Sequence, residues 1–215
     1  MGNAFFVVWR ESLEAFLIAG ILYAWLQGND TSGKGKQALF VGLAAGVGLA
    51  LLLGWALLTV QDELTGNALE AFQTGTLLVA AGLITQMVLW MRKNGRQMKA
   101  RLHADLSAAA EKSGVVGVAL VAALAVAREG AETVIFLYGM SQEGDYSALI
   151  GGALAGFAGA AATAWLAAKS LARLNIGLLL RLSSILLLVL ASALFVAAID
   201  RLIGAGWLTP MLDPV

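Results

Sequence analysis

The sequence contains no cysteine, one histidine and two prolines in 215 residues. Without cysteine the chain has no disulfide, no thiolate metal site and no thiol nucleophile, and one histidine cannot build a histidine-rich metal site. Two prolines exclude a proline-rich linker. Charge is scarce as well, because Asp, Glu, Lys and Arg make up 13% of the residues and their formal charges cancel. A chain with no net positive charge lacks the basic field of a nucleic-acid-binding protein, so we expect no nucleic-acid partner.

Apolar residues, by contrast, are abundant. They make up 60% of the sequence, against about 45–50% in soluble proteins, and the mean hydropathy is +0.81. A soluble globule of this size cannot hide so much apolar surface, and a disordered chain would be far more polar. The composition therefore predicts an integral membrane protein whose main surroundings are the lipid bilayer.

Six apolar stretches are long enough to cross a bilayer, which takes about 20 residues in an α-helix. They are Ala4–Leu26, Ala38–Val60, Ala68–Met91, Val115–Met140, Ser147–Ala168 and Ile176–Ile199. The connections between these stretches are short and contain most of the charged residues. The sequence thus predicts an all-α polytopic membrane protein with six transmembrane helices.

The charges of the connections indicate an orientation. Lysine and arginine fall in the first, third and fifth connections, at Lys34, Lys36, Arg92, Lys93, Arg96, Lys99, Arg101, Lys112, Lys169 and Arg173. The second and fourth connections contain acidic residues instead, at Asp62, Glu63, Glu143 and Asp145. Because short cytoplasmic loops are rich in lysine and arginine, we expect the odd connections in the cytoplasm and the N-terminus outside.

The second and fifth stretches resemble each other without gaps. Ala38, Leu39, Gly42, Ala45, Gly46 and Trp55 correspond to Ala148, Leu149, Gly152, Ala155, Gly156 and Trp165. Each copy keeps two glycines one turn apart, a spacing that lets two helix backbones approach closely. We therefore expect a first three-helix repeat (1–91), a cytoplasmic basic connector (92–113), a second three-helix repeat (114–200) and an outer C-terminal tail (201–215). Repeats of three helices lie in opposite orientations, which is typical of secondary transporters.

The first and fourth stretches share a charged motif. Residues 10–14 (RESLE) and 128–132 (REGAE) both read R-E-x-x-E. Each ionisable group near the centre of a membrane helix costs about 2.5–3.5 kcal/mol on insertion, so two such motifs indicate a function. In a helix both glutamates of a motif lie on one face, and the arginine reaches the second glutamate one turn further on.

Two such motifs on crossing helices would bring four carboxylates together near the middle of the membrane. The predicted metal ligands are Glu11, Glu14, Glu129 and Glu132. Arg10 and Arg128 are expected to orient these carboxylates and keep them ionised. Carboxylate oxygens are hard ligands, so the site favours a hard cation over Cu(I). The competing interpretation is a pair of arginine–glutamate clamps that only hold the helices together.

These residues resemble those of the high-affinity iron permease family, also called the oxidase-dependent iron transporters, which includes fungal permeases and bacterial EfeU-type proteins. Its hallmark is an R-E-G-L-E-type motif in the first and fourth spans, matched here by residues 10–14 and 128–132. The resemblance implies that the four glutamates bind iron as a transported substrate, with no fixed cofactor. It also implies an acidic site at the outer start of the third span, where Glu70 matches the first acid and Gln73 replaces the second.

The resemblance further implies inward transport of iron across the inner membrane of a bacterium, with Fe(III) favoured over Fe(II), and no enzymatic step. In the family the ion arrives from a partner oxidase or a periplasmic protein on the outer face. Family members usually have seven spans, so the seventh is expected to be absent from this sequence. Association into a homo-oligomer is left open.

Two other functions fit the same residues. One is transport of another hard divalent cation such as Mn²⁺, which carboxylate ligands accept as well. The other is an intramembrane di-metal carboxylate enzyme, although such enzymes use Glu-x-x-His motifs and both motifs here lack the histidine. Met87, Met91 and Met140 are expected to be packing residues rather than ligands.

Overall fold

The computed structural model describes residues 2–29, 33–94, 98–142, 146–169 and 176–208. In these ranges the chain forms helices and no strands. The helices are α1 (Gly2–Asn29), α2 (Lys34–Glu63), α3 (Gly66–Asn94), α4 (Met98–Ser141), α5 (Tyr146–Lys169) and α6 (Ile176–Gly204). Such long helices form because the apolar runs contain no proline, which would remove a backbone hydrogen bond. The predicted all-helical architecture of a polytopic membrane protein is confirmed.

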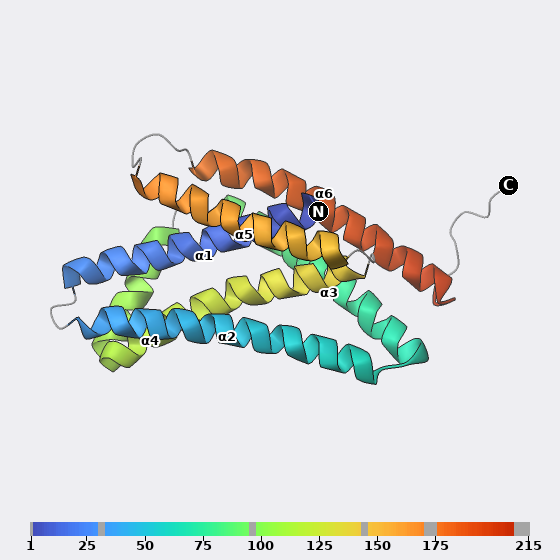
Figure 1. The fold of residues 1–215 in the computed structure, drawn as a ribbon, viewed down its shortest axis with the longest axis horizontal. Helices are drawn as coiled ribbons and strands as arrows, with labels where there is room; N and C mark the ends of the chain where they lie inside the picture. The colour runs from blue at the N-terminus through green and yellow to red at the C-terminus, as the bar shows by residue number, and fades with distance from the viewer. Residues whose placement is uncertain (1, 30–32, 95–97, 143–145, 170–175, 209–215) are drawn as a thin grey trace.

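Five of the six helices are long and apolar enough to cross a membrane. Among the described residues α1 is the exception, and its charged residues Arg10, Glu11 and Glu14 are the physical reason. Figure 1 shows α1 between α5 on one side and α4 on the other, so protein as well as lipid surrounds it. That α1 crosses the membrane therefore remains an expectation, based on its length and on these neighbours.

The outside of the helix bundle is covered by large apolar side chains. Leu51, Trp55 and Leu154 are 67–68% exposed, and many other leucines, valines and phenylalanines are similarly exposed. A soluble monomer rarely exposes apolar surface on this scale. These side chains are therefore positioned to face lipid.

The helices run back and forth along the long axis of the molecule (Figure 1). Basic residues gather at one end of this axis and acidic residues at the other, as two helices illustrate. α2 begins with Lys34 at the end of the molecule where α5 stops at Lys169. α2 finishes with Asp62 and Glu63 at the opposite end. This sorting is what the predicted orientation requires, and the sidedness itself stays a prediction. Arg96, Glu143, Asp145 and Arg173 lie outside the described residues.

A glycine contact joins α2 to α4. A Cβ atom on Gly46 would lie 2.7 Å from the carbonyl oxygen of Ala123 and 3.0 Å from the backbone nitrogen of Ala127. These two α4 residues precede Arg128 by five positions and by one. Only glycine lets the two backbones approach so closely.

The equivalent glycine of the fifth stretch makes the equivalent contact. A Cβ atom on Gly156 of α5 would lie 2.5 Å from the carbonyl oxygen of Phe5 and 3.0 Å from the backbone nitrogen of Trp9, both in α1. Phe5 and Trp9 precede Arg10 by five positions and by one. α5 therefore packs on α1 as α2 packs on α4, which supports the predicted repeat. The boundaries of the repeats remain a prediction.

Most of the basic segment between α3 and the fourth apolar stretch, from Met98 on, is helical. It forms the first part of α4, which bends sharply at Gly114 (φ 56°, ψ −132°), a backbone conformation suited to glycine (Figure 1). Leu106 in this part is fully buried against Ile18 and Leu22 of α1. The segment is thus a packed helix, and its cytoplasmic location remains a prediction.

Two apolar clusters lie on either side of the charged motif of α1. One contains Val7 together with buried residues of α3, α4 and α6. The other contains Ile18 and Leu22 with residues of α2 and α4. The motif at residues 10–14 falls between these clusters, so it is held in the dry interior of the bundle.

Candidate metal site

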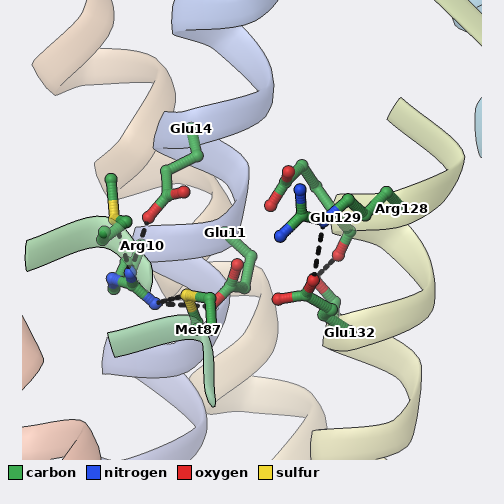
Figure 2. A network of polar contacts seen from close by, with 9 residues as sticks. Arg10, Glu11, Glu14, Met87, Arg128, Glu129 and Glu132 are labelled. Carbon is green, nitrogen blue, oxygen red and sulfur yellow. Dashed lines mark hydrogen bonds and ion pairs between the residues drawn. The ribbon is translucent and has the colours of Figure 1, made fainter. Parts of the chain in front are cut away.

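The two R-E-x-x-E motifs face each other across the contact between α1 and α4 (Figure 2). All four motif glutamates are buried, with exposed fractions of 1–9%. At 1.5 Å per residue, Glu11 and Glu14 lie about 14–18 Å from the start of α1, and Glu129 about 18 Å from the end of α4. These distances are about half the thickness of a hydrocarbon core, which is about 30 Å, so a midplane position of the motifs remains a prediction.

Three of the four predicted ligands converge. One carboxylate oxygen each of Glu11, Glu14 and Glu129 lies within 4.8 Å of the others. Oxygen ligands at about 2.0–2.6 Å from a common cation have separations of this order. Glu132 is buried nearby but does not belong to this group of three within the part of the chain that the structure describes. One cation can thus contact three of these carboxylates without a large rearrangement.

Arg10 is the fully buried member of the first motif. Its Nη1 lies 3.1 Å from Oε1 of Glu11, and its Nη2 lies 2.9 Å from Oε1 of Glu14. Arg10 Nε and Glu11 Oε2 are buried without a hydrogen-bond partner. A buried acceptor without a partner costs free energy, and a cation bound to Oε2 of Glu11 would remove that cost.

Arg128 is arranged differently, although its motif matches that of Arg10. Its Nε donates to Oε1 of Glu132 at 3.1 Å, but 51% of its side chain is exposed. Its guanidinium lies over the ring of Trp90, 5.2 Å from the centroid. Oε2 of Glu132 is buried without a hydrogen-bond partner. The second arginine is therefore half exposed and paired with Glu132, whereas the first is fully buried against both glutamates of its motif (Figure 2).

Two methionines complete the surroundings of Arg10, and sequence reasoning assigned them to packing alone. Nη1 of Arg10 contacts the sulfur of Met87, and Nη2 lies 2.9 Å from the sulfur of Met91. The two methionines are four residues apart on α3 and so lie on one helix face. That spacing is the signal in the sequence that could have grouped the two residues. Met87 and Met140 both belong to the apolar core, and of these two only Met87 contacts Arg10 among the described residues.

The predicted outer acidic site is separate from the carboxylate cluster. Glu70 is exposed in the first turns of α3, and the side-chain oxygen of Gln73 accepts a hydrogen bond from Arg201 of α6 at 2.6 Å. Gln73 precedes Met87 by about 20 Å along the helix axis. Glu70 and Gln73 therefore remain a predicted first contact for a cation at the acidic end of the molecule.

This combination of features defines a class. Ionisable residues buried within a bundle of apolar helices are typical of membrane proteins with an ion pathway or binding site. The chain belongs to the iron permease FTR1 family, whose model matches residues 1–209. The family resemblance inferred from the two motifs is thereby confirmed. Iron is the cargo of such a permease rather than a fixed cofactor, as expected.

The curated relatives are named as permeases of bacteria. The chain is 33% identical over 141 residues to the ferrous iron permease EfeU of Yersinia pestis and 32% identical over 141 residues to that of Escherichia coli O6:K15:H31. Each match covers 65% of this chain, and 50% and 51% of the respective relative. The chain thus spans about half the length of the relatives it matches. No solved structure matches the chain.

Proposed function

We propose that the protein is a membrane permease that moves iron inward through the buried carboxylates of its two R-E-x-x-E motifs. The observation that supports this most directly is the group formed by Glu11, Glu14 and Glu129, whose oxygens lie within 4.8 Å of one another in the interior of the bundle. Glu132 is the fourth ligand in this proposal, because its buried Oε2 has no hydrogen-bond partner. Membership of the iron permease family supports iron as the cargo.

Charge balance favours the ferrous ion. Four ionised glutamates and two arginines carry a net charge of about −2, which one divalent cation neutralises. The relatives are named ferrous iron permeases. The family resemblance implied Fe(III), which agrees with a site made of oxygen ligands, but Fe(II) accepts carboxylate ligands as well. We therefore propose Fe(II) as the transported ion.

Uptake of radioactive iron by sealed proteoliposomes tests the proposal. Vesicles with the protein are expected to accumulate Fe(II) under anaerobic, reducing conditions faster than protein-free vesicles, and faster than they accumulate Fe(III) citrate. Excess Mn(II) is expected to compete weakly. Accumulation of Mn(II) without iron would identify a different hard-cation transporter. Equal uptake with and without protein would contradict the permease proposal.

The proposed orientation, with the N-terminus outside, is open to a clean test because the chain has no cysteine. Glu63→Cys at the end of α2 and Lys93→Cys at the end of α3 place a single thiol at opposite ends of the molecule. In intact bacteria a membrane-impermeant maleimide is expected to label the cysteine at 63 only, and the cysteine at 93 only after permeabilisation. The reverse pattern would place the basic end outside.

The remaining parts of the proposal concern the surroundings of the permease. The relatives come from bacteria, so we place the protein in the bacterial inner membrane. The acidic end, with Asp62, Glu63 and Asp200, suits a periplasmic protein that delivers iron there, because clustered acidic residues concentrate cations. An oxidase partner is required only if the ion is supplied as Fe(III). The two three-helix repeats, 1–91 and 114–200, are the halves between which the ion passes.

A further inference from the structure

The guanidinium of Arg10 occupies a position where four potential metal donors converge. Its Nη1 contacts a carboxylate oxygen of Glu11 and the sulfur of Met87, and its Nη2 contacts a carboxylate oxygen of Glu14 and the sulfur of Met91. Each of these two nitrogens therefore has one carboxylate oxygen and one sulfur as neighbours. The side chain of Arg10 is fully buried, so bulk solvent does not reach this position.

The two sulfurs are poor partners for a guanidinium and good partners for a metal. A thioether is a weak hydrogen-bond acceptor, and Arg10 keeps its Nε without any partner. Thioethers bind the softer and borderline metal ions, and carboxylates bind the harder ones. Two sulfurs and two carboxylates around one buried cation therefore make a better coordination site than an arginine pocket.

The second motif shows that its arginine can pair with a glutamate while half of its side chain is exposed. Arg128 starts from the same place in its motif as Arg10, yet half of its side chain is exposed and it lies over Trp90. The backbone of the motif is helical in both cases. The R-E-x-x-E motif thus accommodates its arginine either fully buried against both glutamates or half exposed and paired with the second glutamate.

We propose that Met87 and Met91 are metal ligands that become available when Arg10 swings outward. A ferrous ion then takes the place of the guanidinium, bound by the carboxylates of Glu11 and Glu14 and by the two sulfurs. The charges support the exchange, because two carboxylates balance a divalent ion better than a single positive guanidinium. The mixed oxygen and sulfur ligands select Fe(II) over Fe(III) and Mn(II), which favour oxygen alone. This inference rests on the proposed permease function and names the ligands that set its selectivity.

A direct test observes the sulfur position. In the full-length protein labelled with selenomethionine and loaded anaerobically with Fe(II), X-ray absorption at the selenium edge is expected to show an iron neighbour at bonding distance. The signal is expected to vanish in a Met87→Leu/Met91→Leu variant. It is expected to persist in Met140→Leu, a matched control that removes another buried methionine. Iron bound without any selenium–iron signal in the unsubstituted protein would overturn the inference.

A second measurement compares metal ions. The Met87→Leu/Met91→Leu variant is expected to lose more than about 10-fold in Fe(II) affinity, because losing an outer-shell partner of a metal site alone costs about 10–100-fold. Its Mn(II) affinity is expected to stay close to that of the unsubstituted protein. Equal losses for both ions would show that the methionines only position Arg10. If the variant keeps full Fe(II) affinity while glutamate variants lose it, the methionine inference fails and the permease proposal stands. If the unsubstituted protein binds no iron, both fail together.

Discussion

Replacing Glu14 and Glu132 together by glutamine is expected to reduce Fe(II) uptake by more than about 100-fold, because changes to the outer shell of a metal site alone cost 10–100-fold. Glutamine keeps the size and the hydrogen-bonding oxygen of each side chain but removes one negative charge from each motif. The cluster then holds a net charge near zero and no longer attracts a divalent ion. The measurement is the initial rate of radioactive iron uptake into proteoliposomes that contain equal amounts of protein.

The control for this double variant is Glu111→Gln, which makes the same chemical change at an exposed position in the basic part of α4. It is expected to transport iron at the unsubstituted rate. Thermal unfolding in detergent separates lost transport from lost structure, and Arg10 keeps Glu11 as a partner in the double variant. Undiminished uptake by the Glu14/Glu132 variant would favour the interpretation that the motifs are structural clamps.

Gly46→Ala is expected to destabilise the protein by about 1–3 kcal/mol, the usual cost of overpacking a close contact. The new methyl group would lie 2.7 Å from the carbonyl oxygen of Ala123 and 2.9 Å from Cβ of Val126, both on α4. Neither atom belongs to the flexible end of a side chain, so the helices must separate. Separation of α2 from α4 also moves Glu129, and iron uptake is expected to fall along with the unfolding temperature in detergent.

Gly48→Ala in the same helix is the matched control. No heavy atom lies within 4 Å of the position that its Cβ would occupy. Alanine is a better helix former than glycine by up to about 1 kcal/mol, so this variant is expected to be unchanged or slightly more stable. Gly156→Ala is expected to behave like Gly46→Ala, because its Cβ would lie 2.5 Å from the carbonyl oxygen of Phe5. Equal effects at positions 46 and 48 would contradict the glycine contact.

Local chemistry explains why much of the fold was predictable. Long apolar runs without proline form membrane helices wherever they occur, and five of the six predicted spans meet this criterion in the structure. The duplicated R-E-x-x-E motif identified the family, which the match over residues 1–209 confirms. The pattern of charged connections also predicted which helix ends lie together, because alternate connections return to the same end of a bundle (Figure 1).

The two motifs have the same residue pattern, but their arginines have different surroundings in the structure. The spacing of residues in the sequence did not predict this difference. Arg10 is buried against Met87 and Met91, because the face of α3 that bears these sulfurs points at α1. Arg128 instead lies over the ring of Trp90, which is also in α3. Sequence reasoning placed the methionines in the core, since a buried methionine packs in most proteins and its neighbours on other helices are not encoded nearby in the chain.

By itself the sequence determined the helices, the family and the residue types of the candidate site, because these depend on hydropathy over about 20 residues and on spacings within one helical turn. Only the tertiary structure decided which carboxylates converge, which arginine is buried between donors and which methionines reach it. Those outcomes depend on how α1, α3 and α4 pack, and that packing is decided by glycine contacts and side-chain shapes from segments far apart in the chain.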